Sequence, residues 1–244
     1  MNNCNFTYNH YKEVLQKALD KKYEIMGCAE YLKRKKLGQL HSKVLVMRHD
    51  VDAKLIRAYE MARIEKELDI NTTYFIRVFS NEYNIFDYNC LPLIRKIEEM
   101  GHEIGYHAEP VDVSRNTGME YDRCFRIGKR ALELITDNEV IGVASHREAT
   151  GNNNLQEYLK NANYEHLEVQ YEAYDNRTFD LFEKSHYVTD GYEWYWRSYE
   201  KGKLTDKRQC LCKIIEEDNP LIYCLVHPNS WYKKHYHNIF SVED

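Results

Sequence analysis

The feature that most constrains the fold is a repeated alternation of short apolar segments with amphipathic ones. The sequence predicts strands at 43–48, 72–78, 102–107, 140–145 and 221–226. It predicts helices at 54–68, 91–100 and 123–135, because apolar residues recur there at spacings of three and four. Strands that alternate with long helices form parallel βαβ units. We therefore predict an α/β fold whose parallel sheet is either open or closed into a (β/α) barrel.

Shorter patterns complete the expected element order. Helices are predicted at 11–19, 155–162 and 208–217, and strands at 166–169 and 187–188. The chain has 244 residues, without repeats or a Pro- or Ser-rich linker, and a single barrel domain commonly has about this length. We expect one catalytic domain over 1–244, with 1–42 as an N-terminal helical extension packed on it.

Composition restricts the partners and the compartment. The net charge of -5 argues against nucleic acid, which needs a clustered basic face. No apolar run reaches the ~18 residues of a membrane span, and residues 1–11 lack the charged start and apolar core of a secretory signal. Seven scattered cysteines fit a reducing compartment, so a cytoplasmic location is expected. The sequence does not indicate an oligomeric state.

The only close cysteine pair is Cys210 and Cys212, inside the predicted helix 208–217. Residues two apart on a helix point to different faces. The spacing therefore predicts neither a metal site nor a redox role for this pair.

The first strong strand is followed directly by two carboxylates, Asp50 and Asp52. Because they are two residues apart, both face the same side of an extended chain. Neighbouring carboxylates repel each other unless a cation lies between them or one is protonated. A metal ligand beside a general base meets that requirement. The alternative is structural: Asp52 caps the following helix and Asp50 forms a surface salt bridge.

Three more strand ends carry ionisable side chains. His107 ends the strand at 102–107, His146 and Arg147 follow the strand at 140–145, and His227 follows the strand at 221–226. Imidazole is a common neutral ligand of zinc, although a single histidine is more often just a hydrogen-bonded polar residue. Since a parallel barrel brings distant strand ends to one rim, together these residues predict a metal site.

Two motifs carry a resemblance to a known family. R-H-D-V-D at 48–52 and G-H-E-I-G-Y-H at 101–107 resemble motifs of the polysaccharide deacetylases (NodB-like, carbohydrate esterase family 4). The resemblance spans roughly 44–231. It implies a distorted TIM barrel, usually of seven strands, with a divalent metal held by one aspartate and two histidines. Zinc is the expected ion, with cobalt, nickel, manganese and iron as alternatives.

The same resemblance implies a role for each matching residue. Asp50 becomes the general base, and His227 becomes the general acid. Asp52 and His107 become metal ligands, and Arg147 becomes the residue that orients the base.

The chain departs from the family pattern at the second metal histidine. That histidine is expected four residues after His107, where this chain has Val111. We expect His146 to supply the third ligand, with Glu109 as the alternative.

Other residues are predicted to contact the sugar. They are Glu109, Asp190, Trp194 and Trp231, which combine acids and aromatic rings after predicted strands. The alternative for the aromatic residues is peripheral packing.

The resemblance implies metal-dependent removal of an N-acetyl group from a sugar. A cytoplasmic enzyme does not reach finished cell-wall polymer, so the expected substrate is an acetylated sugar or glycan precursor of surface-polysaccharide biosynthesis. Two alternatives remain open. One is a non-catalytic saccharide-binding barrel that has lost its metal, and the other is a metal amidohydrolase acting on a non-sugar C–N bond.

Overall fold

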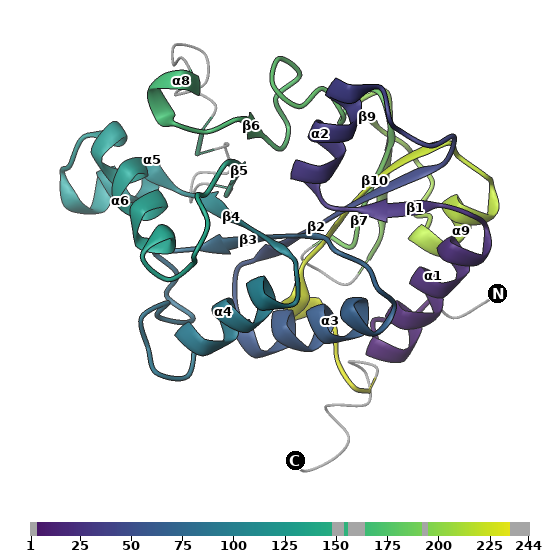
Figure 1. The fold of residues 1–244 in the computed structure, drawn as a ribbon, viewed down its shortest axis with the longest axis horizontal. Helices are drawn as coiled ribbons and strands as arrows, with labels where there is room; N and C mark the ends of the chain where they lie inside the picture. Colours follow the sequence, from purple (N-terminus) through teal and green to yellow (C-terminus); the bar gives the residue numbers. More distant parts are fainter. Residues whose placement is uncertain (1–3, 148–153, 156–163, 192–194, 235–244) are drawn as a thin grey trace.

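The computed structural model describes residues 4–147, 154–155, 164–191 and 195–234. A mostly parallel sheet forms its centre and helices lie around it (Figure 1). Seven parallel strands follow one another in space: β6 (Tyr171–Glu172), β5 (Gly142–Ser145), β4 (Glu103–Ala108), β3 (Thr73–Arg77), β2 (Val44–Val51), β10 (Leu221–Val226) and β7 (His186–Thr189). The antiparallel strands β8 (Arg197–Glu200) and β9 (Lys203–Leu204) extend the sheet beyond β7. The predicted α/β class is confirmed.

The first and last strands in the order of the sheet are β6 and β9. Over the described ranges, β6 pairs with β5 and β9 pairs with β8, and no pairing joins the two ends. Closure into a seven-stranded barrel therefore stays a prediction.

The N-terminal segment contributes more than helices. It contains α1 (Tyr8–Asp20), β1 (Glu24–Met26) and α2 (Cys28–Leu37). The short strand β1 pairs in parallel with the first half of β2, whereas β3 pairs with the second half. The segment expected as a helical extension thus contains two helices and also adds a short strand to the sheet.

The remaining helices agree with the sequence pattern in part. They are α3 (Leu55–Glu67), α4 (Leu91–Glu99), α5 (Pro110–Thr117), α6 (Tyr121–Glu133), α8 (Tyr164–Leu167), α9 (Leu211–Glu216) and the 3-10 helix η1 (Pro228–Ser230). In Figure 1, α3 and α4 lie together on one side of the sheet, and α1 lies beside α9.

Two predicted elements differ from the structure, and a third is not described. The strand predicted at 166–169 is wrong, because α8 covers Tyr164–Leu167 and the next strand begins at Tyr171. So short a segment does not distinguish the period of two from that of 3.6. The helix predicted at 208–217 begins only at Leu211. Nearly all of the helix predicted at 155–162 lies outside the described residues.

Strand β2 is buried along its whole length, and its alternation divides the molecule into two sides. Val44 and Val46 pack among residues such as Phe75 and Tyr223. Arg48 lies on the same side, with its guanidinium against the Phe75 ring. His49 points the other way, where its Nε2 lies 3.2 Å from Glu65 Oε1. The carboxyl end of β2 therefore directs Asp50, and Asp52 beyond it, to the side that Arg48 occupies. None of the helices described is long and apolar enough to cross a membrane.

Candidate active site

A cavity of about 680 Å³ lies at the carboxyl ends of parallel strands of the sheet. Its lining includes Asp50 and Asp52 from the end of β2, His107 from β4, His146 after β5 and His227 after β10. These are the residues that the strand-end argument singled out. Asp52 does not cap the following helix, because the N-cap of α3 is Lys54. Asp50 does not form a surface salt bridge, because both carboxylates are buried.

One carboxylate and two imidazoles converge in this cavity. Asp52 Oδ1 lies 3.2 Å from His107 Nε2 and 3.6 Å from His146 Nε2. The two rings are nearly perpendicular, with centroids 5.1 Å apart. The three residues thus present one oxygen and two nitrogens around a common point.

The hydrogen bonds of His107 fix which nitrogen faces Asp52. Its Nδ1 lies 3.0 Å from the carbonyl oxygen of Ala144. A carbonyl oxygen only accepts, so Nδ1 carries the hydrogen. In a neutral ring Nε2 then presents a lone pair to Asp52 Oδ1. Two lone pairs at 3.2 Å repel unless a proton or a metal cation lies between them.

The pKa directions fit this arrangement. Burial opposes the charged form of His107, but the carboxylates of Asp50 and Asp52 outweigh burial and raise its pKa. Burial likewise opposes the charged form of Asp52, yet its pKa is lowered because of the adjacent imidazole of His107 and the charges of His227 and His146. The pKa of His146 is lowered to about 4 by burial and by the nearby His107. A neutral His146 is the form in which imidazole binds metal.

The residues present fit a divalent cation. Ligand atoms ~2.1 Å from a tetrahedral ion lie about 3.4 Å apart, and the two distances from Asp52 Oδ1 are 3.2 and 3.6 Å. Within the described ranges, buried Asp52 Oδ1 and Asp50 Oδ1 accept no hydrogen bond. A buried oxygen without a donor is costly, and a cation removes that cost.

His146, rather than Glu109, completes the group with Asp52 and His107. Since β5 ends at Ser145, both His146 and Arg147 can line the cavity. Glu109 is taken up by other contacts, because its Oε2 accepts a hydrogen bond from Arg77 Nε at 2.7 Å. Its nearest approach to His146 is 3.9 Å.

The guanidinium that contacts Asp50 comes from Arg48. Its Nη2 donates to Asp50 Oδ2 at 3.2 Å, and its Nη1 donates to the Tyr223 hydroxyl at 3.1 Å. Arg48 belongs to the R-H-D-V-D motif, two residues before Asp50 and on the same face of the strand. That spacing could have predicted this contact. Arg147, expected to orient the base, is an exposed residue of the cavity lining.

Asp190 and Trp231 do not line the cavity as the sequence predicted. Both are buried, and the indole Nε1 of Trp231 donates to Asp190 Oδ2 at 3.0 Å. Asp190 also accepts from the backbone nitrogen of His227 at 2.8 Å and from its Nδ1 at 2.7 Å. Asp190 therefore orients His227, and Trp231 holds Asp190. The remaining predicted contact, Trp194, lies outside the described residues.

The protonated form of His227 is strongly favoured. Burial lowers its pKa, but the charge and hydrogen bond of Asp190, followed by the charges of Asp52 and Asp50, raise it to about 9. At neutral pH the cavity therefore contains an imidazolium able to donate a proton.

An aromatic wall lies on one side of the cavity, and sequence reasoning missed it. It consists of Tyr174, Phe182, Tyr187 and Tyr199. Phe182 packs edge-on against Tyr187, with centroids 4.9 Å apart. Since β8 is antiparallel and short, no βαβ pattern pointed to Tyr199. In a chain with 21 tyrosines, composition alone does not distinguish these rings from others.

No known protein-family model matches the sequence, and no curated protein matches it. The solved structures that it matches include the Streptococcus pyogenes deacetylase PplD in complex with acetate, at 17% identity and a TM-score of 0.45, covering 62% of this chain and 67% of that one. A CE4 family pseudoenzyme from Bacillus anthracis matches at 15% identity and a TM-score of 0.45, covering 79% of this chain and 60% of its own. The chitin deacetylase of the fungal pathogen Colletotrichum lindemuthianum matches at 17% identity and a TM-score of 0.43, covering 75% of this chain and 73% of that one.

Proposed function

We propose that this chain is a divalent-metal-dependent hydrolase that removes an N-acetyl group from a sugar. One observation carries the proposal: Asp52, His107 and His146 converge in a cavity that also contains a second carboxylate, Asp50, and the imidazolium of His227. Metal-assisted amide hydrolysis uses these parts, namely a cation, a base and an acid.

We assign the role of general base to the carboxylate of Asp50. Asp52, His107 and His146 would hold a divalent ion, with zinc as the proposed ion, and the ion would supply Lewis-acid polarisation of the acetyl carbonyl and of water. Asp50 would accept the proton of the attacking water at Oδ1. Its other oxygen, Oδ2, is held by Arg48 at 3.2 Å, so the carboxylate keeps its orientation while it accepts the proton.

His227 supplies the proton that the leaving amine needs. An amide nitrogen leaves poorly unless it is protonated. With a pKa of about 9, His227 is charged at neutral pH, and its bond from Nδ1 to Asp190 leaves Nε2 as the nitrogen that donates.

The aromatic wall of Tyr174, Phe182, Tyr187 and Tyr199 supports a sugar as the substrate. Aromatic rings pack against the apolar face of a pyranose, and the cavity volume lies in the range of small-molecule sites, ~300–1,000 Å³. We infer that the substrate is a small acetylated sugar or a glycan precursor of surface-polysaccharide biosynthesis. A cytoplasmic location is part of this proposal, because all seven cysteines are free.

Acetate release tests the proposal. The zinc-loaded protein is assayed with nucleotide-linked, lipid-linked and oligomeric N-acetyl sugars, and with acetamides that contain no sugar. Asp50→Asn and His227→Gln should each lower turnover by about 10²–10⁴-fold and still bind zinc.

Two results would reject the proposal in favour of the alternatives. Sugar binding without acetate release from any substrate indicates a non-catalytic binding protein. Acetate release from non-sugar acetamides alone indicates an amidohydrolase of another specificity.

A further inference from the structure

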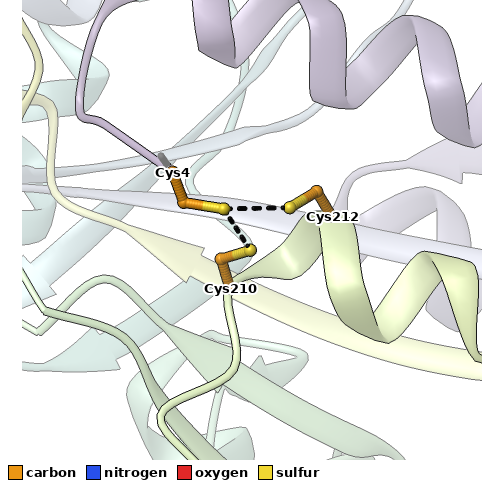
Figure 2. Close-up of side chains that lie close together, drawn as sticks. All are labelled: Cys4, Cys210 and Cys212. Atoms are coloured by element: carbon orange, nitrogen blue, oxygen red, sulfur yellow. Dashed lines mark hydrogen bonds between the residues drawn. The ribbon is translucent and has the colours of Figure 1, made fainter. Parts of the chain in front are cut away.

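Three cysteines from distant parts of the sequence meet outside the candidate active site. Cys4 Sγ lies 2.7 Å from Cys210 Sγ and 3.2 Å from Cys212 Sγ, and Figure 2 shows the three sulfurs pointing toward one another. Cys4 precedes α1, whereas Cys210 and Cys212 belong to the start of α9. More than 200 residues separate the two segments.

The start of α9 explains how Cys210 and Cys212 come to face the same point. The sequence pattern placed both on one helix, on different faces. In the structure Cys210 is the residue before the helix, with extended backbone angles (φ -72°, ψ 160°), and the helix begins at Leu211. The rule for residues two apart on a helix therefore does not apply, and the two side chains can turn toward a common point.

We propose that Cys4, Cys210 and Cys212 form a second metal site, which binds a thiophilic divalent cation such as Zn²⁺. Three converging sulfurs are a soft donor set of the kind that selects zinc over hard cations. Cys210 and Cys212 are 4% and 6% exposed, which shields the site from competing water. Cys4 is half-buried, so an ion and one further ligand from solvent can reach the fourth position.

The geometry needs only a small adjustment to accept the ion. Sulfurs bound at ~2.3 Å in a tetrahedral site lie about 3.8 Å apart, so the contacts of 2.7 and 3.2 Å must open by about 1 Å or less. Cys4 lies in the segment before α1 and can move by this amount without disturbing a helix. A disulfide, in contrast, joins only two of the three sulfurs and requires an oxidant.

A filled site holds the N-terminal segment in place next to the candidate active site. Two residues after Cys4, the carbonyl oxygen of Phe6 accepts a hydrogen bond from the backbone nitrogen of Tyr232 at 3.0 Å. The Phe6 ring packs edge-on against Trp231, with centroids 5.3 Å apart. Since Trp231 holds Asp190, the cysteine site lies at one end of a continuous set of contacts that reaches His227.

Metal content and a cobalt spectrum test this proposal on the full, reduced chain. The protein is loaded with Zn²⁺, exchanged into metal-free buffer and analysed for bound zinc. We expect two equivalents in the wild type and one in Cys4→Ser. Loading with Co²⁺ should give the near-ultraviolet charge-transfer absorption of thiolate coordination, and Cys4→Ser should lose it.

Matched variants separate the two sites. Cys124→Ser changes a buried cysteine outside the cluster and should retain both zinc equivalents and the absorption. Asp52→Asn should lose the other equivalent and retain the absorption, so failure of one site is distinguishable from failure of the other. If Cys4→Ser fails to fold, Cys212→Ser replaces it.

Two results would overturn the proposal. The first is a wild-type protein that lacks the cobalt absorption and whose zinc content does not change in Cys4→Ser. The second is a protein purified anaerobically without reductant whose mass is lower by two hydrogen atoms because Cys4 and Cys210 are cross-linked.

Discussion

Replacing Asp190 with asparagine removes the carboxylate that keeps His227 protonated while changing its shape little. In the wild type the pKa of His227 is about 9, compared with 6.5 for an ordinary histidine. Since one pKa unit corresponds to about 1.4 kcal/mol, the preference for the charged ring is on the order of 3 kcal/mol. Asp190 is its largest favourable cause. The amide has one acceptor oxygen in place of two, so its NH₂ group faces Nδ1 and favours the neutral ring.

The expected loss of activity depends on pH. If the pKa of His227 returns to about 6.5, the protonated fraction at pH 8 falls from about 90% to about 3%. The rate constant kcat/KM of zinc-loaded Asp190→Asn should then fall about thirtyfold at pH 8 and less than about twofold at pH 6. The alkaline limb of the pH profile should move to lower pH by as much as the pKa of His227 falls. Proton NMR titration of His227 in the metal-free protein measures the pKa shift without relying on activity.

The control removes a comparable contact elsewhere. Asp122 Oδ2 lies 2.8 Å from His166 Nε2 in an exposed pair, so Asp122→Asn deletes an Asp–His contact far less shielded from water. Its pH profile should match that of the wild type. If Asp190→Asn retains an alkaline limb near pH 9 and an unshifted His227 titration, the reasoning that links Asp190 to the acid is refuted.

Three further predictions concern stability and metal binding. The raised pKa of His227 stabilises the folded chain fully below pH ~6.5, and this contribution is lost as pH rises through ~9. Urea unfolding of the metal-free protein should show that the free energy of unfolding falls by an amount on the order of 3 kcal/mol over that range. A free energy of unfolding that does not change with pH contradicts this prediction. His146→Gln should weaken Zn²⁺ binding at the candidate active site by more than ~10–100-fold, which is the loss typical of a residue outside the ligand set. Competition with a chromophoric chelator measures the affinity, in a Cys4→Ser background. A larger loss in Glu109→Gln would assign the third ligand to Glu109. In Gly105→Ala the new Cβ would lie 2.4 Å from the Phe75 ring, so Tm should fall by an amount equivalent to about 1–3 kcal/mol, with partial recovery in Gly105→Ala/Phe75→Leu; an unchanged Tm in the single variant shows that the ring moves freely.

Local periodicity allowed much of the fold to be predicted. The last strand was predicted at 221–226, which are the bounds of β10. The spacing of two between Asp50 and Asp52 predicted that both would face one side, and both line the same cavity. These predictions succeed because a period of 2 or 3.6 is a property of neighbouring residues and survives in any fold that buries one face.

The departures at the site concern the partners of the predicted residues. Arg48, two residues away, contacts Asp50 in place of Arg147. Asp190 binds His227 across 37 positions, and Trp231 is buried instead of facing a substrate. A motif identifies a polar side chain at a strand end, but the identity of its partner depends on which strands become neighbours and where each strand stops.

The sequence by itself determined the alternation of strands and helices, the side to which each strand directs its residues, and the set of ionisable groups at the strand ends. Only the tertiary structure distinguished His146 from its alternative Glu109 as the residue beside Asp52 and His107, and only it showed that Cys4 meets Cys210 and Cys212. The physical reason is that burial patterns are encoded along the chain, whereas a site formed from several segments depends on packing between residues that have no local relation to one another.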